Sequence, residues 1–247
     1  MCCGIMDMLL SEEILVHENQ IICICLEGIA LEAKISQVEI MQLLNKLYAQ
    51  SVNGVAKVSP PIDDLANDYL QKSKDTHTAA KKFIHYQIAK CTTSGIITGL
   101  GGLITLPVAI PANVGSVMYV QMRMIACLAY MGGYDTNSDQ VQTLVYACLA
   151  GISIDQLLKS VGIKLGNKLT MAMIKKIPGT VLTKINQKVG FRFITKFGSK
   201  GLINLGKAVP VVGGVLGGGF DFAETRVIAS RAYKMFIEGD IEVLSGE

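Results

Sequence analysis

Residues 91–122 read CTTSGIITGLGGLITLPVAIPANVGSVMYVQM, thirty-two positions without one charged side chain. A glycine cluster occupies the first half, Pro107 and Pro111 follow, and the end has the character of a helix. An uncharged stretch of this length has to be buried, either in lipid or in a large helical core. The two prolines would interrupt a simple membrane span, so a path through lipid would be broken or re-entrant.

The composition places the chain between soluble globular proteins and proteins built only of membrane spans. Half of its 247 residues are hydrophobic and 17% are charged, and the mean hydropathy is +0.41. Trp is absent and Phe and Tyr are few, so the apolar mass is aliphatic and rich in small residues that let helices approach closely. A chain of this length can bury a substantial core.

Helical signals recur along the chain, and strand alternation does not. Pro111 is placed to begin a helix and Gly132-Gly133 to end it, with Arg123 as its one charge. Further helices are predicted at Met41–Tyr48, after Pro60-Pro61, at Thr76–Cys91, at Gln140–Ile154 and at Phe220–Ile237. We predict an all-α, multi-helix domain over residues 41–240, with glycine-rich apolar helical hairpins, one basic amphipathic helix and a tail at 241–247.

Positive charge is concentrated in one segment. Residues 156–220 contain eleven Lys or Arg and no acid, while the rest of the chain has twelve basic and twenty acidic residues. Such a segment is attracted to anionic lipid or to nucleic acid. Five cations recur every four residues beside an apolar ridge, and these two sets are Lys184, Lys188, Arg192, Lys196, Lys200 and Leu182, Ile185, Val189, Phe193, Phe197.

This pairing of a cationic and an apolar face is typical of a helix at a membrane interface. We therefore predict that the five cations form a face for anionic lipid, with the apolar ridge facing the membrane or the core. The alternative is a solvated face of a soluble helix. Nucleic-acid binding is disfavoured, because no aromatic residues interleave with the cations and the opposite face is apolar.

Motifs for catalysis and cofactors are missing from the sequence. GLINLGKA at 201–208 imitates a phosphate-binding loop, but Ala208 replaces the hydroxyl residue and no strand precedes it. No GxSxG or HExxH occurs, and three histidines are too few for a His-rich metal site. The seven cysteines include no CxxC, which favours a reducing compartment. We predict no catalytic residues, no metal and no cofactor; a hydrolase acting on a membrane-linked substrate is the alternative.

Arg123 is the one charge between Lys90 and Asp135. A buried, unpaired guanidinium would cost several kcal/mol, so it needs an anionic partner. We predict a buried ion pair with Asp221 or Glu224, with Asp155 as a further candidate. The alternatives are a functional anion or lipid site and a side chain that reaches the surface. Asp221 and Glu224 share a helical face, but such acids serve more often as caps or ion-pair partners than as a catalytic pair.

Three strings resemble the EcsC family: GLGGLITLPVAIPA at 99–112, QMRMIACLAYMGGYD at 121–135, and KAVPVVGGVLGGGFDFAETR at 207–226. The resemblance covers the chain from Met41 to Asp240. It implies a helical protein. It also implies a link to ABC exporters, because bacterial members are named for a gene that lies beside an ABC exporter. No enzymatic activity is implied. Residues 1–40 fall outside it, which favours an N-terminal extension or a start codon placed too early.

These observations predict a non-enzymatic, membrane-associated protein at the cytoplasmic face of the cell membrane. Its expected partner is the anionic membrane surface, and the resemblance adds a membrane transporter or an envelope process. A soluble helical binding module remains the alternative. The sequence does not choose between peripheral attachment and partial insertion, and it leaves the oligomeric state open.

Overall fold

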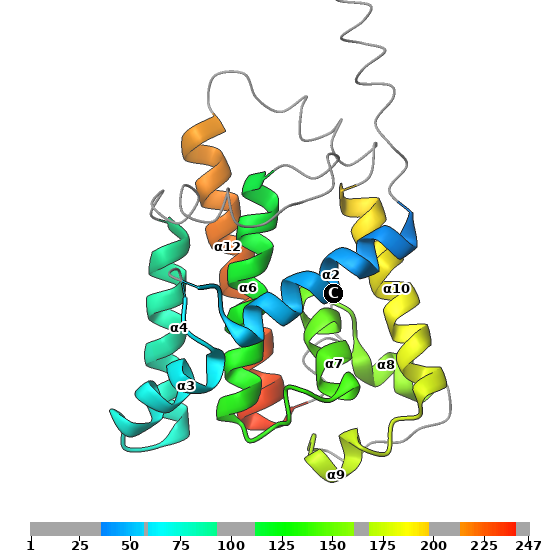
Figure 1. The fold of residues 1–247 in the computed structure, drawn as a ribbon, viewed down its shortest axis with the longest axis horizontal. Helices are drawn as coiled ribbons and strands as arrows, with labels where there is room; N and C mark the ends of the chain where they lie inside the picture. Colours follow the sequence, from blue (N-terminus) through cyan, green and yellow to red (C-terminus); the bar gives the residue numbers. More distant parts are fainter. Residues whose placement is uncertain (1–35, 57–58, 93–111, 161–167, 198–212, 241–247) are drawn as a thin grey trace, which may run out of the picture. The chain divides into compact units, whose positions relative to one another are not determined.

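A computed structural model describes residues 36–56, 59–92, 112–160, 168–197 and 213–240 (Figure 1). Helices dominate these ranges, and the one β feature there is an isolated bridge between Val55 and Ser59. The helices are α2 (Gln37–Asn53), α3 (Ile62–Gln71), α4 (Thr76–Thr92), α6 (Ala112–Met131), α7 (Asp139–Ala150), α8 (Ile154–Ser160), α9 (Met171–Ile174), α10 (Gly179–Phe197), α12 (Gly213–Tyr233) and the π-helix η1 (Lys234–Glu238). The all-α prediction is confirmed.

Helix α6 is the central element of the fold. It packs against α2, α3, α4, α7 and α12, which surround it in Figure 1. Every residue from Met118 to Ala129 is buried, so all faces of this helix are covered by protein. A helix that is apolar on every side belongs in such a core. The last part of the uncharged stretch is therefore core, and residues 93–111 lie outside the described ranges.

The end of α6 follows the local sequence signals. The Gly132 N–H donates to the Leu128 carbonyl, and Gly133 adopts a φ of +80°, which glycine tolerates without steric cost. Gly132 also lies directly against the backbone carbonyl of Phe236 in η1. The chain can turn there because the first glycine has no side chain and the second has a left-handed backbone.

Three predicted boundaries differ from the observed ones. Helix α2 begins at Gln37, before the expected Met41, because Ser36 and Glu39 form a capping box. The helix expected over 140–154 ends at Ala150, where Gly151 adopts a φ of +65°, and α8 follows. Helix α12 begins at Gly213, not at Phe220. Helix α12 as a whole packs on α4 and α6, and such tertiary contacts can override the intrinsic cost of about 1 kcal/mol for each helical glycine relative to alanine.

In the described ranges, no helix is both long enough and apolar enough to cross a membrane.

Candidate functional site

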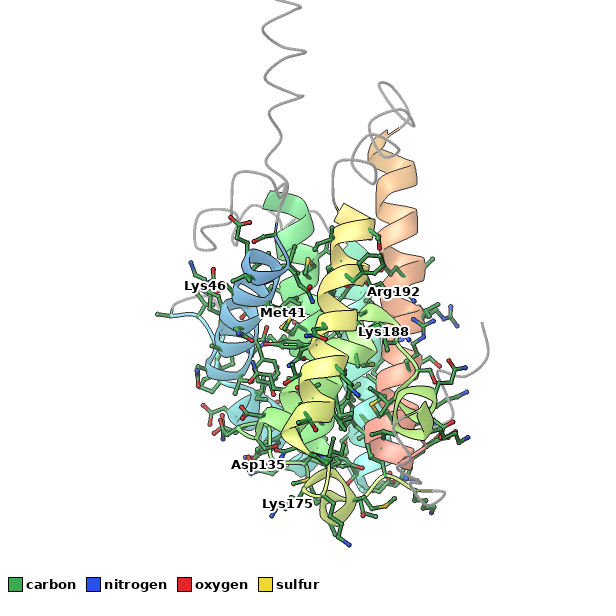
Figure 2. The ribbon with its side chains drawn as sticks, turned by 90° about the vertical axis from the view of Figure 1, so that its right-hand side faces the viewer. Met41, Lys46, Asp135, Lys175, Lys188 and Arg192 are labelled. Atoms are coloured by element: carbon green, nitrogen blue, oxygen red, sulfur yellow. The ribbon has the colours of Figure 1, made fainter. Side chains whose placement is uncertain are left out.

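The cationic face of α10 is the candidate site that the sequence predicts most directly. Lys184, Lys188 and Arg192 are exposed on this helix, and the last two lie one turn apart in Figure 2. The side chain of Lys196 and the whole of Lys200 lie outside the described residues. Three of the five predicted cations are therefore shown to share a helix surface, and the other two stay a prediction.

The described side chains of the apolar ridge of α10 face the protein core, and the side chain of Phe197 lies outside the described residues. Leu182, Ile185, Val189 and Phe193 are all buried, and α10 packs on α2 and α7. Gly190 lets α2 approach closely, because a Cβ there would lie 2.8 Å from Cγ of Gln37. The Gln37 amide also donates to the Gln187 carbonyl at 2.8 Å. Of the two predicted environments for this ridge, the membrane and the core, these four residues occupy the core.

Phe191 is a member of the α10 face that the sequence analysis missed. Its side chain is 65% exposed. It follows Lys188 by three residues and Lys184 by seven, so the three share one helical face. The same spacing, read from the sequence, could have placed it among the cations.

Ion pairs do not neutralise the described cations of this face. Among the described residues, no carboxylate forms an ion pair with Lys184, Lys188 or Arg192. Arg192 approaches the C-terminal end of α7, where its guanidinium lies 3.6 Å from a Cβ built on Gly151. The partial negative charge of a helix C-terminus favours a cation at this place. The face remains positively charged as a whole.

Arg123 forms a second, buried polar cluster in the middle of α6. Its side chain is 6% exposed, and its guanidinium donates to two backbone carbonyls, those of Ser51 and Pro60. One turn earlier, the Tyr119 hydroxyl contacts the Ser59 hydroxyl at 2.6 Å. These contacts hold the end of α2 and the loop before α3 against α6. The cluster supports the connection between two helices.

The predicted acidic partners of Arg123 have separate outcomes. Asp155 forms an ion pair with Lys159, at 2.7 Å. Glu224 is half-buried on α12, and the side chain of Asp221 lies outside the described residues. The two carbonyl acceptors are the contacts found for Arg123, and pairing with Asp221 or Glu224 stays a prediction. The sequence does not mark these two carbonyls as partners of Arg123, because every residue has a backbone carbonyl.

A groove between α4 and α12 is a further feature that the sequence did not predict. It has a volume of about 520 Å³, and its lining includes Lys81, His85 and Arg226. Its residues come from segments more than 130 positions apart, so no local motif marks it.

The core contains two buried, free cysteines, Cys127 and Cys148. Burial raises the pKa of the Cys127 thiol and that of the Cys148 thiol to about 12. In the part of the chain that the structure describes, no group of three His, Cys, Asp or Glu side chains is placed to bind a metal ion.

The profile of the EcsC protein family matches residues 32–237. The chain belongs to this family. The match confirms the resemblance seen in the three glycine-rich and apolar strings, and it begins before the boundary expected at Met41. No curated protein and no solved structure matches the sequence. The family membership of this EcsC protein adds no binding or catalytic residue, so a function has to be argued from its own surfaces.

Proposed function

We propose that this EcsC protein is a non-enzymatic, peripheral protein of the cytoplasmic membrane surface that binds anionic lipid through α10. The observation that carries the proposal is the exposed face of Lys184, Lys188 and Arg192, with Phe191, which is 65% exposed, on the side of Lys184 and Lys188. Cations attract lipid phosphates, and an aromatic side chain enters the headgroup region. The two contributions act on the same side of one helix.

The size of the electrostatic contribution is sufficient for reversible attachment. Each Lys or Arg near an anionic surface contributes about 1 kcal/mol, so three cations contribute about 3 kcal/mol. Partial burial of one phenylalanine ring adds about 1–2 kcal/mol. Salt weakens the first contribution and leaves the second nearly unchanged.

The packing of α10 favours attachment over insertion. The ridge that a membrane-embedded amphipathic helix would bury in lipid is already buried against α2 and α7. Exposing it to lipid would require this helix to leave the core. Contact through the opposite, cationic face needs no such rearrangement.

Vesicle co-sedimentation tests this proposal. The protein should bind vesicles of phosphatidylcholine with 30% phosphatidylglycerol, and binding should fall as salt rises. Changing Lys184, Lys188 and Arg192 to Gln should weaken binding roughly 100-fold, since about 3 kcal/mol is lost. The single change Phe191→Ser should weaken vesicle binding about tenfold. It should also reduce the binding that remains at high salt.

A matched control removes the same charge elsewhere. Lys46, Lys74 and Lys82 are exposed on other elements, and Figure 2 shows Lys46 on α2, away from Lys188 and Arg192. Their triple change to Gln should leave vesicle binding within a factor of two or so of the wild type. Equal losses for both triple variants would mean that net charge, not α10, governs binding. Binding that ignores lipid charge would refute the proposal outright.

We propose a membrane transporter or envelope process as the context of this attachment, following the link between EcsC proteins and exporters. A peripheral protein bound through α10 leaves its other helices available for such a partner. Cross-linking in cells, with and without the α10 triple change, tests this. Equal capture of a transporter by both forms would show that partner binding does not depend on lipid attachment.

A further inference from the structure

The groove between α4 and α12 combines an apolar floor with polar rims. Ile84 and Ile88 are half-buried in it and Ala229 is buried, while Lys81 and Arg226 are exposed. The described residues of the lining are Lys81, Ile84, His85, Ile88, Ala89, Arg226, Ala229, Ser230 and Tyr233. Its volume of about 520 Å³ lies within the range of small-molecule sites.

The two helices run antiparallel along the groove. Lys81 Nζ lies 5.7 Å from the centre of the Tyr233 ring, and His77 Nδ1 lies 2.8 Å from the Tyr233 hydroxyl. These contacts place the start of α4 beside the end of α12, an arrangement visible in Figure 1. Lys81 and His85 thus form one rim, and Ser230 and Arg226 form the other.

The described charges of the groove are of one sign. Its described lining includes Lys81, Arg226 and the imidazole of His85, and none of these described residues is an acid. Within the described residues, none of these three forms an ion pair. The hydroxyl of Ser230 adds a neutral donor between the cations. A ligand for these rims has to be anionic, and one for the floor has to be apolar.

We propose that this groove binds a single-chain amphiphile whose head group is a phosphate monoester. The alkyl chain lies on Ile84, Ile88 and Ala229. The phosphate receives charge-assisted hydrogen bonds from Lys81 and Arg226 and a further bond from Ser230. A phosphate has three terminal oxygens and close to two negative charges, so it can engage donors from both rims, whereas a carboxylate has two oxygens and one charge.

This site does not depend on the proposed membrane attachment. Helices α4 and α10 lie at opposite edges of the helical array in Figure 1, with α6 and α7 between them. The triple change at Lys184, Lys188 and Arg192 should therefore leave the groove intact. Failure of vesicle binding and failure of ligand binding can be observed separately.

Calorimetry with n-dodecyl phosphate, kept below its micellar concentration, tests the proposal on the full chain. We expect saturable binding of one molecule. Lys81→Gln and Arg226→Gln should each raise the dissociation constant about tenfold, as expected for the loss of a charge-assisted hydrogen bond. Ser230→Trp should block the groove and abolish binding. Because the changed residues are exposed, the melting temperature should stay near that of the wild type.

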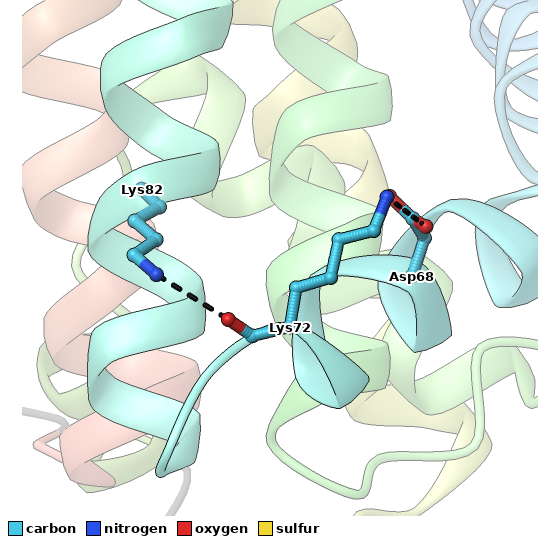
Figure 3. Close-up of polar contacts among 3 residues, drawn as sticks. All are labelled: Asp68, Lys72 and Lys82. Carbon is cyan, nitrogen blue, oxygen red and sulfur yellow. Dashed lines mark hydrogen bonds and ion pairs between the residues drawn. The ribbon is translucent and has the colours of Figure 1, made fainter.

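Lys82 provides the matched control on the same helix. Its ammonium donates to the Lys72 carbonyl at 3.4 Å, beside the Lys72–Asp68 ion pair, as Figure 3 shows. It therefore points to the corner between α3 and α4 and is not part of the groove lining. Lys82→Gln removes the same charge as Lys81→Gln and should leave the dissociation constant unchanged.

Ligand analogues separate the parts of the claim. Inorganic phosphate and neutral dodecyl maltoside should bind much more weakly than dodecyl phosphate, and dodecanoate should fall between them and dodecyl phosphate. Equal affinity for dodecanoate would overturn the assignment of a phosphate head group. Equal effects of Lys81→Gln and Lys82→Gln, or binding that survives Ser230→Trp, would overturn the assignment of the groove.

Discussion

Arg123, in the middle of α6, donates a hydrogen bond of 2.9 Å to the backbone carbonyl of Ser51, in the last turn of α2. Carbonyls in the last turn of a helix have no partner within the helix, so the guanidinium satisfies one of them. Its second donor group reaches the Pro60 carbonyl, beyond the turn at Gly54. A core arginine thereby fixes the path between α2 and α3.

Replacing this arginine should destabilise the protein through those two carbonyls. Arg123→Met keeps much of the volume and removes both hydrogen bonds. Because hydrogen bonds from charged donors contribute about 1.5–3 kcal/mol each, we expect the loss of both to lower the free energy of unfolding by about 3–6 kcal/mol. Urea denaturation measures it. Proteolysis should also become faster between Gly54 and Pro61, where the loop loses its anchor.

The same variant tests the predicted ion pair. If Glu224 or Asp221 neutralises Arg123, double-mutant cycles with Glu224→Gln and Asp221→Asn should give coupling energies above about 1 kcal/mol. Coupling near zero for both acids would leave the two carbonyls as the partners that matter. An unchanged free energy of unfolding in Arg123→Met itself would contradict both interpretations.

Gly132 and Gly133 offer adjacent sites with different physical constraints. A Cβ on Gly132 would overlap the Phe236 backbone carbonyl, which cannot move as a flexible side chain would. A Cβ on Gly133 meets nothing within 4 Å, and the cost there comes from its φ of +80°. We expect Gly133→Ala to cost about 1 kcal/mol and Gly132→Ala about 3 kcal/mol. Thermal denaturation of the two variants measures these costs. A larger loss of stability in Gly133→Ala than in Gly132→Ala would contradict this account.

The start of the domain can be tested by two truncated chains. Starting at Met41 removes the capping box of Ser36 and Glu39 and the buried Ile40. The cap contributes about 1 kcal/mol and the buried side chain about 2 kcal/mol, so this chain should be less stable by roughly 3 kcal/mol. A chain starting at Ile35 keeps both features and should match the full-length protein in urea denaturation. Equal stability of the two would restore the boundary predicted at Met41.

The parts of the fold that the sequence predicted have local causes. In the sequence, Pro111 and Gly132 predict the two ends of a helix from backbone restrictions that act within one turn, and the structure places α6 at Ala112–Met131. Regular spacing on α10 likewise predicted which residues would be buried, from Leu182 to Phe193. Such signals depend on the residue and its close neighbours, so one sequence suffices to find them.

The features that escaped prediction depend on distant parts of the chain. Acceptors for Arg123 are carbonyls of residues 72 and 63 positions away, and carbonyls have no sequence signature. The groove exists because α4 and α12 pack side by side, which brings Lys81 and Arg226 onto one surface. Helix α12 begins seven residues before the predicted Phe220, because helix propensity disfavours its glycines and takes no account of packing.

The last prediction concerns Cys127 and Cys148, which the sequence pattern assigned to apolar helix faces. Both are fully buried, and burial raises the pKa of each thiol to about 12. At pH 8 the reactive thiolate is then only about 10⁻⁴ of the total, and solvent has no access to it. Iodoacetamide should leave these two cysteines unmodified in the native protein and modify both in 6 M guanidinium chloride, as read by peptide mass spectrometry.

The pH dependence of labelling distinguishes an exposed cysteine from a buried one. Raising the pH from 7 to 9 increases the thiolate fraction of an exposed cysteine tenfold or more, because its pKa is near 8.5. A buried thiol reacts only when the core opens, so its labelling should follow the opening equilibrium, which Arg123→Met would shift. Rapid native labelling of Cys127 at pH 8 would show that the centre of α6 is open to solvent. It would also contradict the packing of α2, α4 and α12 around α6, on which both proposed surfaces depend.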